Sequence, residues 1–122
     1  MWPVRARPRP SLTAVTSGAA AAEAAAAVSA DLFFLGVTGV HPEAGLTTGD
    51  ADEAAMKRLL ADRAAETYVL ASVEKMGAAS PFGVLALDRV AGVITDAPAD
   101  SRTVRELAAL GVPVVDAGAG FA

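Results

Sequence analysis

Compact apolar runs alternate with helical patterns along most of the chain. The runs rich in aromatic or β-branched residues predict buried strands over Asp31 to Val37, Thr67 to Ser72, Ala91 to Asp96 and Val112 to Ala117. Apolar positions at helical spacing predict helices over Gly18 to Val28, Asp50 to about Ala65 and Ser101 to Leu110. Since strands joined by crossover helices run parallel, the pattern predicts an α/β fold with an open, mostly parallel sheet and helices on both faces.

The helix predicted to begin at Asp50 carries the clearest local signals. Asp50 can cap this helix together with Glu53, as a capping-box-like pair. Its apolar face is predicted to contain Ala55, Met56, Leu59 and Leu60. Glu53 and Lys57 stand four residues apart, a spacing that indicates either a surface ion pair or the beginning of a functional cluster.

Polar chemistry concentrates between the first strand and this helix, in GVTGVHPEAGLTTGDADEAAMK, residues Gly36 to Lys57. Connections between elements have a median length of about four to six residues, so a longer one rich in glycine and threonine favours a functional loop. The alternative is a plain crossover connection. His41, beside Pro42 in a predicted turn, is interpreted as an exposed loop residue, and a single histidine makes no metal site.

Composition narrows the class of protein. With 122 residues, the chain is predicted to form one domain. Hydrophobic residues make up 53% of the chain and the mean hydropathy is +0.42. Even so, no apolar run approaches the roughly 18–20 residues of a membrane span. The lack of cysteine fits a reducing, cytoplasmic compartment, and the chain has no glycine fingerprint of a nucleotide site, so we expect neither a metal nor a cofactor.

Residues 1–10 are predicted to form an irregular, arginine- and proline-rich arm. Its charges are Arg5, Arg7 and Arg9, for which a nucleic-acid patch is the alternative interpretation. The net charge of −4 and the pI near 4.8 disfavour nucleic-acid binding by the rest of the surface. The small residues that follow resemble an export signal, but Glu23 interrupts the apolar region and prolines crowd its start.

Three motifs follow one another along the chain: ADLFFLGVTGVHPEAGLTTGDADEAAMKR, YVLASVEKMG and VITD. In this order and spacing they resemble the C-terminal effector-sensing domain of DeoR-family bacterial transcriptional regulators, from about Ser11 to Ala117. The resemblance implies a domain that senses a phosphorylated sugar on behalf of a regulator of carbohydrate metabolism. It also implies a fold similar to that of ribose-5-phosphate isomerase and the CoA transferases.

The resemblance further implies which parts of a regulator lie outside this sequence. Family members carry an N-terminal winged helix-turn-helix that binds DNA, and a first strand and loop that help to cradle the sugar phosphate. Neither precedes Ser11, so residues 11–122 are expected to be a partial sensor domain, incomplete at the N-terminus, that does not bind DNA alone. The helix predicted over Gly18 to Val28 is almost all alanine and offers nothing to contact a base edge. The oligomeric state is left open, with a homo-oligomer through the sensor domain among the alternatives.

The likeness to the isomerase raises an enzyme alternative. By this resemblance Glu53 falls at the helix glutamate and Lys75 at the lysine after the next strand, but Thr38 and Val40 stand where the isomerase loop has acids. Proton transfer between sugar carbons needs a positioned base and an acid or electrophile. The sequence therefore predicts a sensing domain rather than an enzyme, with a truncated product lacking independent activity as a third interpretation.

Six residues are the candidates for contact with the effector: Gly36, Gly39, Thr47, Thr48, Glu53 and Lys75. The glycines would let the backbone approach a ligand, the threonines offer hydroxyls, Glu53 can accept hydrogen bonds from sugar hydroxyls, and Lys75 supplies a cation for the phosphate. Both glycines and the lysine follow strand ends, where open parallel sheets bind ligands. The alternatives are turn-forming glycines, a helix-dipole partner at Glu53 and a solvated loop cation at Lys75.

Overall fold

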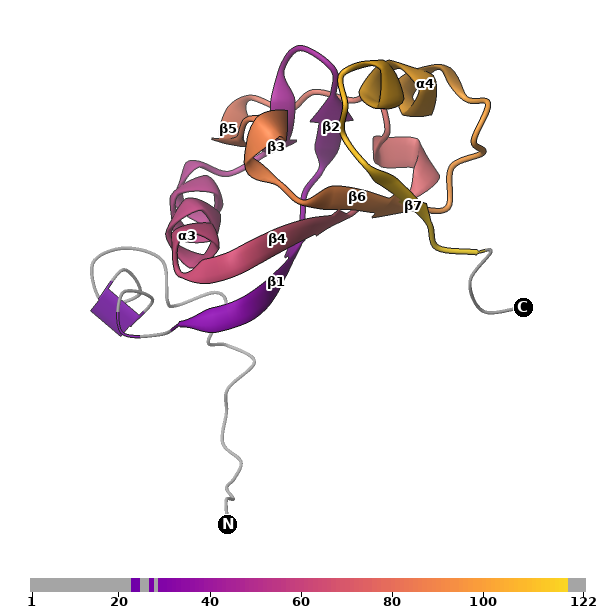
Figure 1. Ribbon diagram of the computed structural model, residues 1–122. Coiled ribbons are helices and arrows are strands. Elements are labelled where there is room, and N and C mark those ends of the chain that lie inside the picture. Colours follow the sequence, from indigo (N-terminus) through magenta and orange to yellow (C-terminus); the bar gives the residue numbers. More distant parts are fainter. Residues whose placement is uncertain (1–22, 25–26, 28, 119–122) are drawn as a thin grey trace.

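A four-stranded parallel sheet forms the base of the structure (Figure 1). The computed structural model describes residues 23–24, 27 and 29–118. In spatial order the strands are β1 (Ala30–Gly36), β4 (Ala64–Leu70), β6 (Gly92–Thr95) and β7 (Val114–Asp116). Every neighbouring pair is parallel, so the four predicted strands and the α/β class are confirmed. The predicted arm at residues 1–10 and most of the predicted helix over Gly18 to Val28 lie outside the described residues.

The polar segment after β1 forms two of the three strands of a second sheet. β2 (Gly39–His41) and β3 (Gly45–Thr48) make an antiparallel hairpin, and β3 also pairs with β5 (Phe82–Leu85). The expectation of one long loop is therefore wrong. The sequence pattern does not predict these strands, because each has only three or four residues. In addition, all of β3 is buried, so polar and apolar residues do not alternate along it.

Two α-helices of the described part connect the strands, α3 (Ala51–Asp62) and α4 (Arg102–Ala109). Short 3-10 turns, η1 (Val73–Lys75) and η2 (Leu87–Arg89), flank β5 along the chain. α4 confirms the helix predicted over Ser101 to Leu110, since these two residues are its caps. None of the helices in the described residues is long and apolar enough to cross a membrane.

The bounds of α3 agree with the prediction at the first residue and differ at the last. The Asp50 carboxylate accepts a hydrogen bond from the Glu53 backbone N–H at 3.2 Å, which is the predicted cap. α3 ends at Asp62 rather than near Ala65, because Ala64 already pairs with Ala30 in the parallel sheet.

The buried face of α3 differs from the predicted one. Ala54 is buried, whereas Ala55 is exposed, and Met56, Leu59 and Leu60 are half-buried. The helix contacts the core along the line of Ala54 and Ala61, which are seven residues apart and so lie on one side of it.

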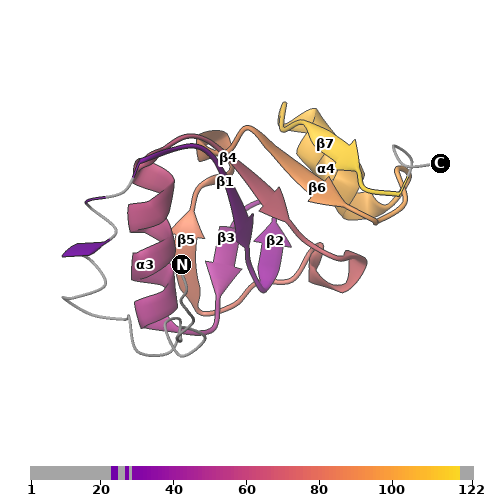
Figure 2. The ribbon, with the colours of Figure 1, turned by 90° about the horizontal axis from the view of Figure 1, so that it is seen from below.

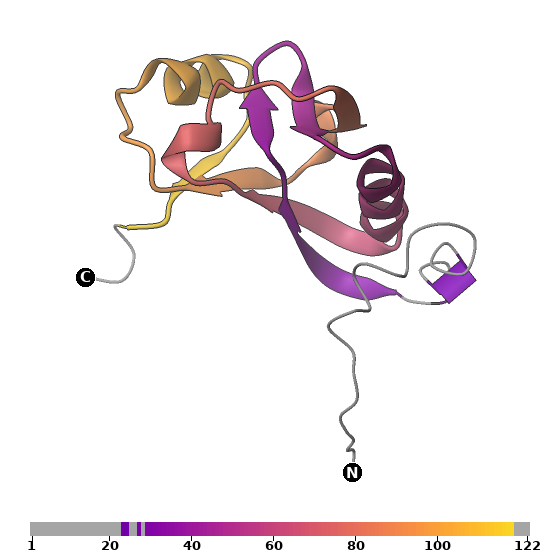
Figure 3. The same ribbon diagram turned by 180° about the vertical axis from the view of Figure 1, so that it is seen from behind.

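The hydrophobic core lies between the two sheets. Leu35, Val69 and Val93 come from neighbouring parallel strands, Val40 and Leu46 come from the hairpin, and all five are 0% exposed. α3, the antiparallel sheet and α4 lie on one side of the parallel sheet, above it in Figure 1 and again in the view from behind (Figure 3). A helix on the opposite face stays a prediction.

Gly39 lies where the hairpin comes closest to a later part of the chain. A Cβ at Gly39 would collide with the carbonyl oxygen of Ala78 and would lie 2.7 Å from the Thr47 hydroxyl oxygen. The neighbouring Gly77 N–H donates to the carbonyl oxygen of Val40 at 2.7 Å. Since Ala78 contributes a backbone atom to the contact, a side chain at position 39 would force the two segments apart.

Gly39→Ala is expected to lower the free energy of unfolding by about 1–3 kcal/mol, the usual cost of an extra methyl group in a filled space. The matched control is Gly83→Ala in β5, because a Cβ there meets nothing within 4 Å. Urea unfolding followed by circular dichroism measures both variants. Equal losses of stability would contradict the close approach at Gly39.

Candidate functional site

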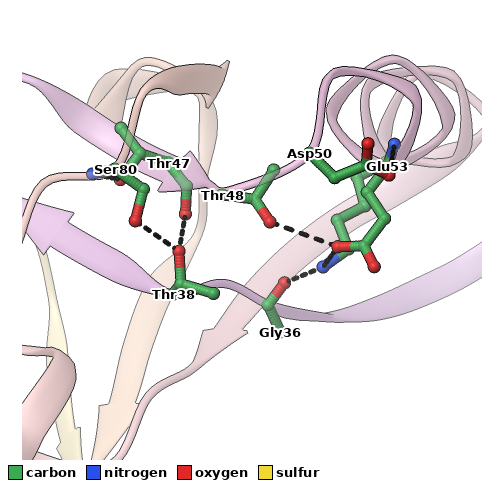
Figure 4. Close-up of polar contacts among 8 residues, drawn as sticks. Gly36, Thr38, Thr47, Thr48, Asp50, Glu53 and Ser80 are labelled. Atoms are coloured by element: carbon green, nitrogen blue, oxygen red, sulfur yellow. Dashed lines mark hydrogen bonds and ion pairs between the residues drawn. The ribbon is translucent and has the colours of Figure 1, made fainter.

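Polar groups gather where β1 leaves the parallel sheet and where α3 begins. Gly36, Thr48, Glu53 and Lys57 are joined there by direct contacts, and we call them the Glu53 cluster (Figure 4). This position is at the carboxyl end of a parallel strand, the edge at which open α/β sheets bind ligands.

Glu53 is the centre of this cluster. The Thr48 hydroxyl donates to Oε1 of Glu53 at 3.2 Å, and Nζ of Lys57 lies 3.7 Å from the same oxygen. Lys57 also donates to the carbonyl oxygen of Gly36 at 2.6 Å. The Glu53 side chain is half exposed, so the carboxylate is oriented by its partners and still open to a ligand.

Lys57 is the residue of the cluster whose role the sequence left undecided. The four-residue spacing predicts its ion pair with Glu53, which the 3.7 Å contact confirms. Its contact with Gly36 joins residues 21 apart in the chain, which no local pattern indicates. Lys57 thereby holds the middle of α3 against the end of β1.

A second polar group adjoins the hairpin, formed by Thr38 and Ser80 (Figure 4). Their hydroxyl oxygens lie 2.6 Å apart, and either can be the donor. Thr38 Oγ1 also donates to the carbonyl oxygen of Thr47 at 3.3 Å. Thr38 is exposed and Ser80 half-buried, so this Thr38–Ser80 pair presents hydroxyl groups at the surface.

Gly39 and Thr47, both predicted ligand residues, lie beneath the Thr38–Ser80 pair. Thr47 is 3% exposed, and its hydroxyl oxygen accepts a hydrogen bond from the Ser80 backbone N–H at 2.8 Å. Gly39 is buried against the carbonyl of Ala78. Their contacts are with the protein itself, and their part in ligand binding stays a prediction.

Lys75 follows β4 in the turn η1, at the same edge of the parallel sheet. The turn is held by Asp96, whose Oδ1 accepts from the Val73 backbone N–H at 2.9 Å. The Lys75 ammonium makes no hydrogen bond or ion pair with another residue of the described part. The structure therefore does not bring Lys75 into direct contact with the Glu53 cluster.

The carboxylate next to Lys75 has a shifted pKa. The Ser72 hydroxyl donates to Oε2 of Glu74 at 2.5 Å, and this hydrogen bond is the main cause that holds the pKa of Glu74 below its ordinary value. The Glu74 backbone N–H and the Lys75 charge act in the same direction. Glu74 thus stays negatively charged beside the lysine.

His41 has a structural role at the hairpin turn. Its Nδ1 accepts hydrogen bonds from the backbone N–H groups of Glu43 and Ala44, both at 3.1 Å. The side chain is half-buried rather than fully exposed, and it closes the turn between β2 and β3. The described residues contain no group of three His, Cys, Asp or Glu side chains that could hold a metal ion.

A cleft of the described part of the chain lies away from these polar groups. It measures about 800 Å³ and is lined by the hairpin turn, by β5 and η2, and by the residues between α4 and β7. None of the six candidate ligand residues lines it. The Glu53 cluster and the Thr38–Ser80 pair are surface groups beside the core, not the walls of this cleft.

Comparison with known proteins gives the family. Residues 10–97 match the family described as DeoR C terminal sensor domain, a range that includes the Glu53 cluster, the Thr38–Ser80 pair and Lys75. The HTH-type transcriptional regulator GlpR of Haloferax volcanii is 38% identical over 86 residues, which cover 70% of this chain and 34% of that protein.

A second relative is the uncharacterized HTH-type transcriptional regulator FruR of Bacillus subtilis. It is 42% identical over 67 residues, which cover 55% of this chain and 27% of that protein. The chain thus spans about a third or less of the length of the curated relatives it matches. Because the family match covers most of the chain and agrees with the α/β fold, the chain belongs to the DeoR family of C-terminal sensor domains.

Proposed function

We propose that this domain senses a phosphorylated sugar and reports it to a DeoR-type regulator of carbohydrate metabolism, which acts on DNA in the cytoplasm. The observation that carries the proposal is the Glu53 cluster, where a half-exposed carboxylate is held by Thr48 and Lys57 at the carboxyl end of β1. A carboxylate oriented in this way accepts hydrogen bonds from sugar hydroxyls, and this edge of an α/β sheet is the usual place for a ligand.

We assign a role in ligand binding to each polar group. Glu53 and the Thr38–Ser80 pair face the hydroxyl groups of the sugar, Gly36 allows the backbone to approach it, and Lys75 takes the phosphate. Support for Lys75 comes from its ammonium, which has no hydrogen-bond or ion-pair partner among the described residues and so can pair with a phosphate.

We infer that the domain is not an enzyme. Isomerisation needs a base and an acid or electrophile around the same sugar carbons. Glu53 could be the base, but the loop after β1 contributes Thr38, whose hydroxyl contacts Ser80 and the Thr47 carbonyl. The regulatory names of the two relatives support the same inference.

The role of Lys75 is tested by Lys75→Ala. A lost charge-assisted contact costs about 1.5–3 kcal/mol, so the dissociation constant of a sugar phosphate should rise about ten- to a hundredfold, with that of the free sugar unchanged. The matched control is Arg89→Ala in η2, at the amino end of β6. Glu53→Ala should weaken the binding of the sugar phosphate and of the free sugar by a similar factor.

The measurement is calorimetry with pentose and hexose phosphates and their unphosphorylated forms. If Lys75→Ala and Arg89→Ala change the dissociation constant of the sugar phosphate by small and equal amounts, Lys75 is a solvated loop cation and does not bind the phosphate.

No turnover of ribose 5-phosphate is expected. The proton-transfer group absent from the loop is typically worth about a hundred- to ten-thousandfold in rate. A coupled assay that follows ribulose 5-phosphate measures this. Saturable activity that disappears in Glu53→Gln would refute the inference.

Sequence-specific binding of duplex DNA by this chain alone is also not expected. With a net charge of −4, contact with phosphates rests on Arg5, Arg7 and Arg9, and it should weaken steeply as salt rises. Gel shifts with promoter DNA and with a scrambled duplex, between 50 and 200 mM salt, compare the chain with the variant in which all three arginines are glutamine. Selective shifts at physiological salt would contradict the expectation.

A further inference from the structure

The motif VITD of β6 ends on an aspartate that is part of neither the Glu53 cluster nor the Thr38–Ser80 pair. Val93 and Thr95 are buried, at 0% and 2% exposed, whereas Asp96, the first residue after the strand, is exposed. The Thr95 hydroxyl oxygen accepts a hydrogen bond from the Ala97 backbone N–H at 3.1 Å, which fixes the backbone around Asp96. β6 therefore presents the Asp96 carboxylate in a defined place at the carboxyl edge of the sheet, where open α/β sheets bind ligands.

Asp96 contacts the turn that carries Lys75. Its Oδ1 accepts a hydrogen bond from the Val73 backbone N–H, 2.9 Å away, although the two residues are 23 apart in the chain. In the view from below, η1 lies beside the end of β6 (Figure 2). Val73 is the first residue of η1 and Lys75 is the last. Asp96 therefore holds the beginning of a turn whose end carries the lysine.

The hairpin holds the chain on the other side of Lys75. Met76 pairs with Val40 of β2, and the Gly77 backbone N–H donates to the Val40 carbonyl oxygen at 2.7 Å. Met76 also packs against the hydrophobic core. Lys75 thus lies between two anchors. One consists of backbone and core contacts, and the other depends on a single carboxylate.

The contact with Asp96 is the hydrogen bond that joins residues 72–75 to another element in the part of the chain that the structure describes. The other hydrogen bonds here stay within the turn: the Lys75 backbone N–H donates to the Ser72 carbonyl oxygen at 2.9 Å, and the Ser72 hydroxyl donates to Glu74. Lys75 is half-buried, so the position of the turn decides where its ammonium can reach.

We propose that Asp96 is a positioning residue of the phosphate site, which holds η1 so that the Lys75 ammonium meets the phosphate of the effector. The inference rests on the proposed function of Lys75. It places an acid near an anion, although a carboxylate and a phosphate repel each other. The site therefore uses the acceptor oxygen of Asp96 and not its charge.

Substitutions at Asp96 separate these two properties. Asp96→Asn keeps an acceptor oxygen and removes the charge, whereas Asp96→Ala removes both. Asp96→Leu keeps the branched shape without an acceptor, so the result does not depend on the folding of one variant. The matched control is Asp116→Ala at the end of β7, because Asp116 also accepts a backbone N–H, that of Gly118 at 2.8 Å, in a segment without a lysine.

The measurement is calorimetry with the pentose and hexose phosphates and their unphosphorylated forms, after circular dichroism of each variant. Asp96→Ala and Asp96→Leu should raise the dissociation constant of the sugar phosphate about three- to tenfold, the net worth of one hydrogen bond, and leave that of the free sugar unchanged. Asp96→Asn and Asp116→Ala should bind the sugar phosphate no more weakly than the unsubstituted chain. Added to Lys75→Ala, Asp96→Ala should have no further effect, because the lysine that it positions is gone.

Other results contradict the proposal in distinguishable ways. If Asp96→Ala binds the sugar phosphate more tightly, Asp96 acts through its charge alone. If Asp96→Ala weakens the free sugar equally, Asp96 contacts the sugar itself, and if Asp96→Asn weakens binding as much as Asp96→Ala, the hydrogen bond to Val73 is not the cause. An unsubstituted chain that binds none of the sugars refutes the proposed function and this inference together, whereas binding that Asp96→Ala leaves unchanged refutes this inference alone.

Discussion

The close approach of Gly39 to the backbone of Ala78 is the constraint on which the polar surface depends. A three-stranded sheet of such short strands has little stability of its own, and this contact fastens its hairpin to the chain that follows β4. The same approach brings the Ser80 N–H to the Thr47 hydroxyl and the Ser80 hydroxyl to Thr38. Without a glycine at position 39, the hydroxyl groups of the Thr38–Ser80 pair would lose their common support.

The sequence predicts the parts of the fold that are regular and local. The apolar runs identify the four parallel strands, and Asp50 and Glu53 identify the beginning of α3. The sequence does not predict the hairpin, because buried glycine and threonine, here in β3, give the same signal as a polar loop. The sequence does not predict where α3 ends, because the pairing of Ala64 with Ala30 is a tertiary contact that helical propensity does not reflect.

The sequence likewise predicts some residues of the candidate site and not others. Motif order pointed to Glu53 and Thr48, which the structure places in one cluster. The sequence marks Thr38 only as a replacement for an acid and gives no signal for Ser80, because their contact joins residues 42 apart in the chain. Residues so far apart form no repeating pattern in the sequence. Their contact follows from how the strands pair in the two sheets, which no motif indicates.

The parallel pairing of β1 with β4 has a consequence for the speed of folding. Ala30 must meet Ala64, so this ladder closes a loop that contains the whole hairpin and α3, whereas β2 and β3 meet across a turn of three residues. Hairpins form in about 1–10 μs, but sheets built from distant partners are slow, because the chain loses loop entropy before their contacts compensate. The hairpin of β2 and β3 and the helix α3 therefore have time to form first, whereas the pairings of β1 with β4 and of β3 with β5 join partners that are distant in the chain and form late.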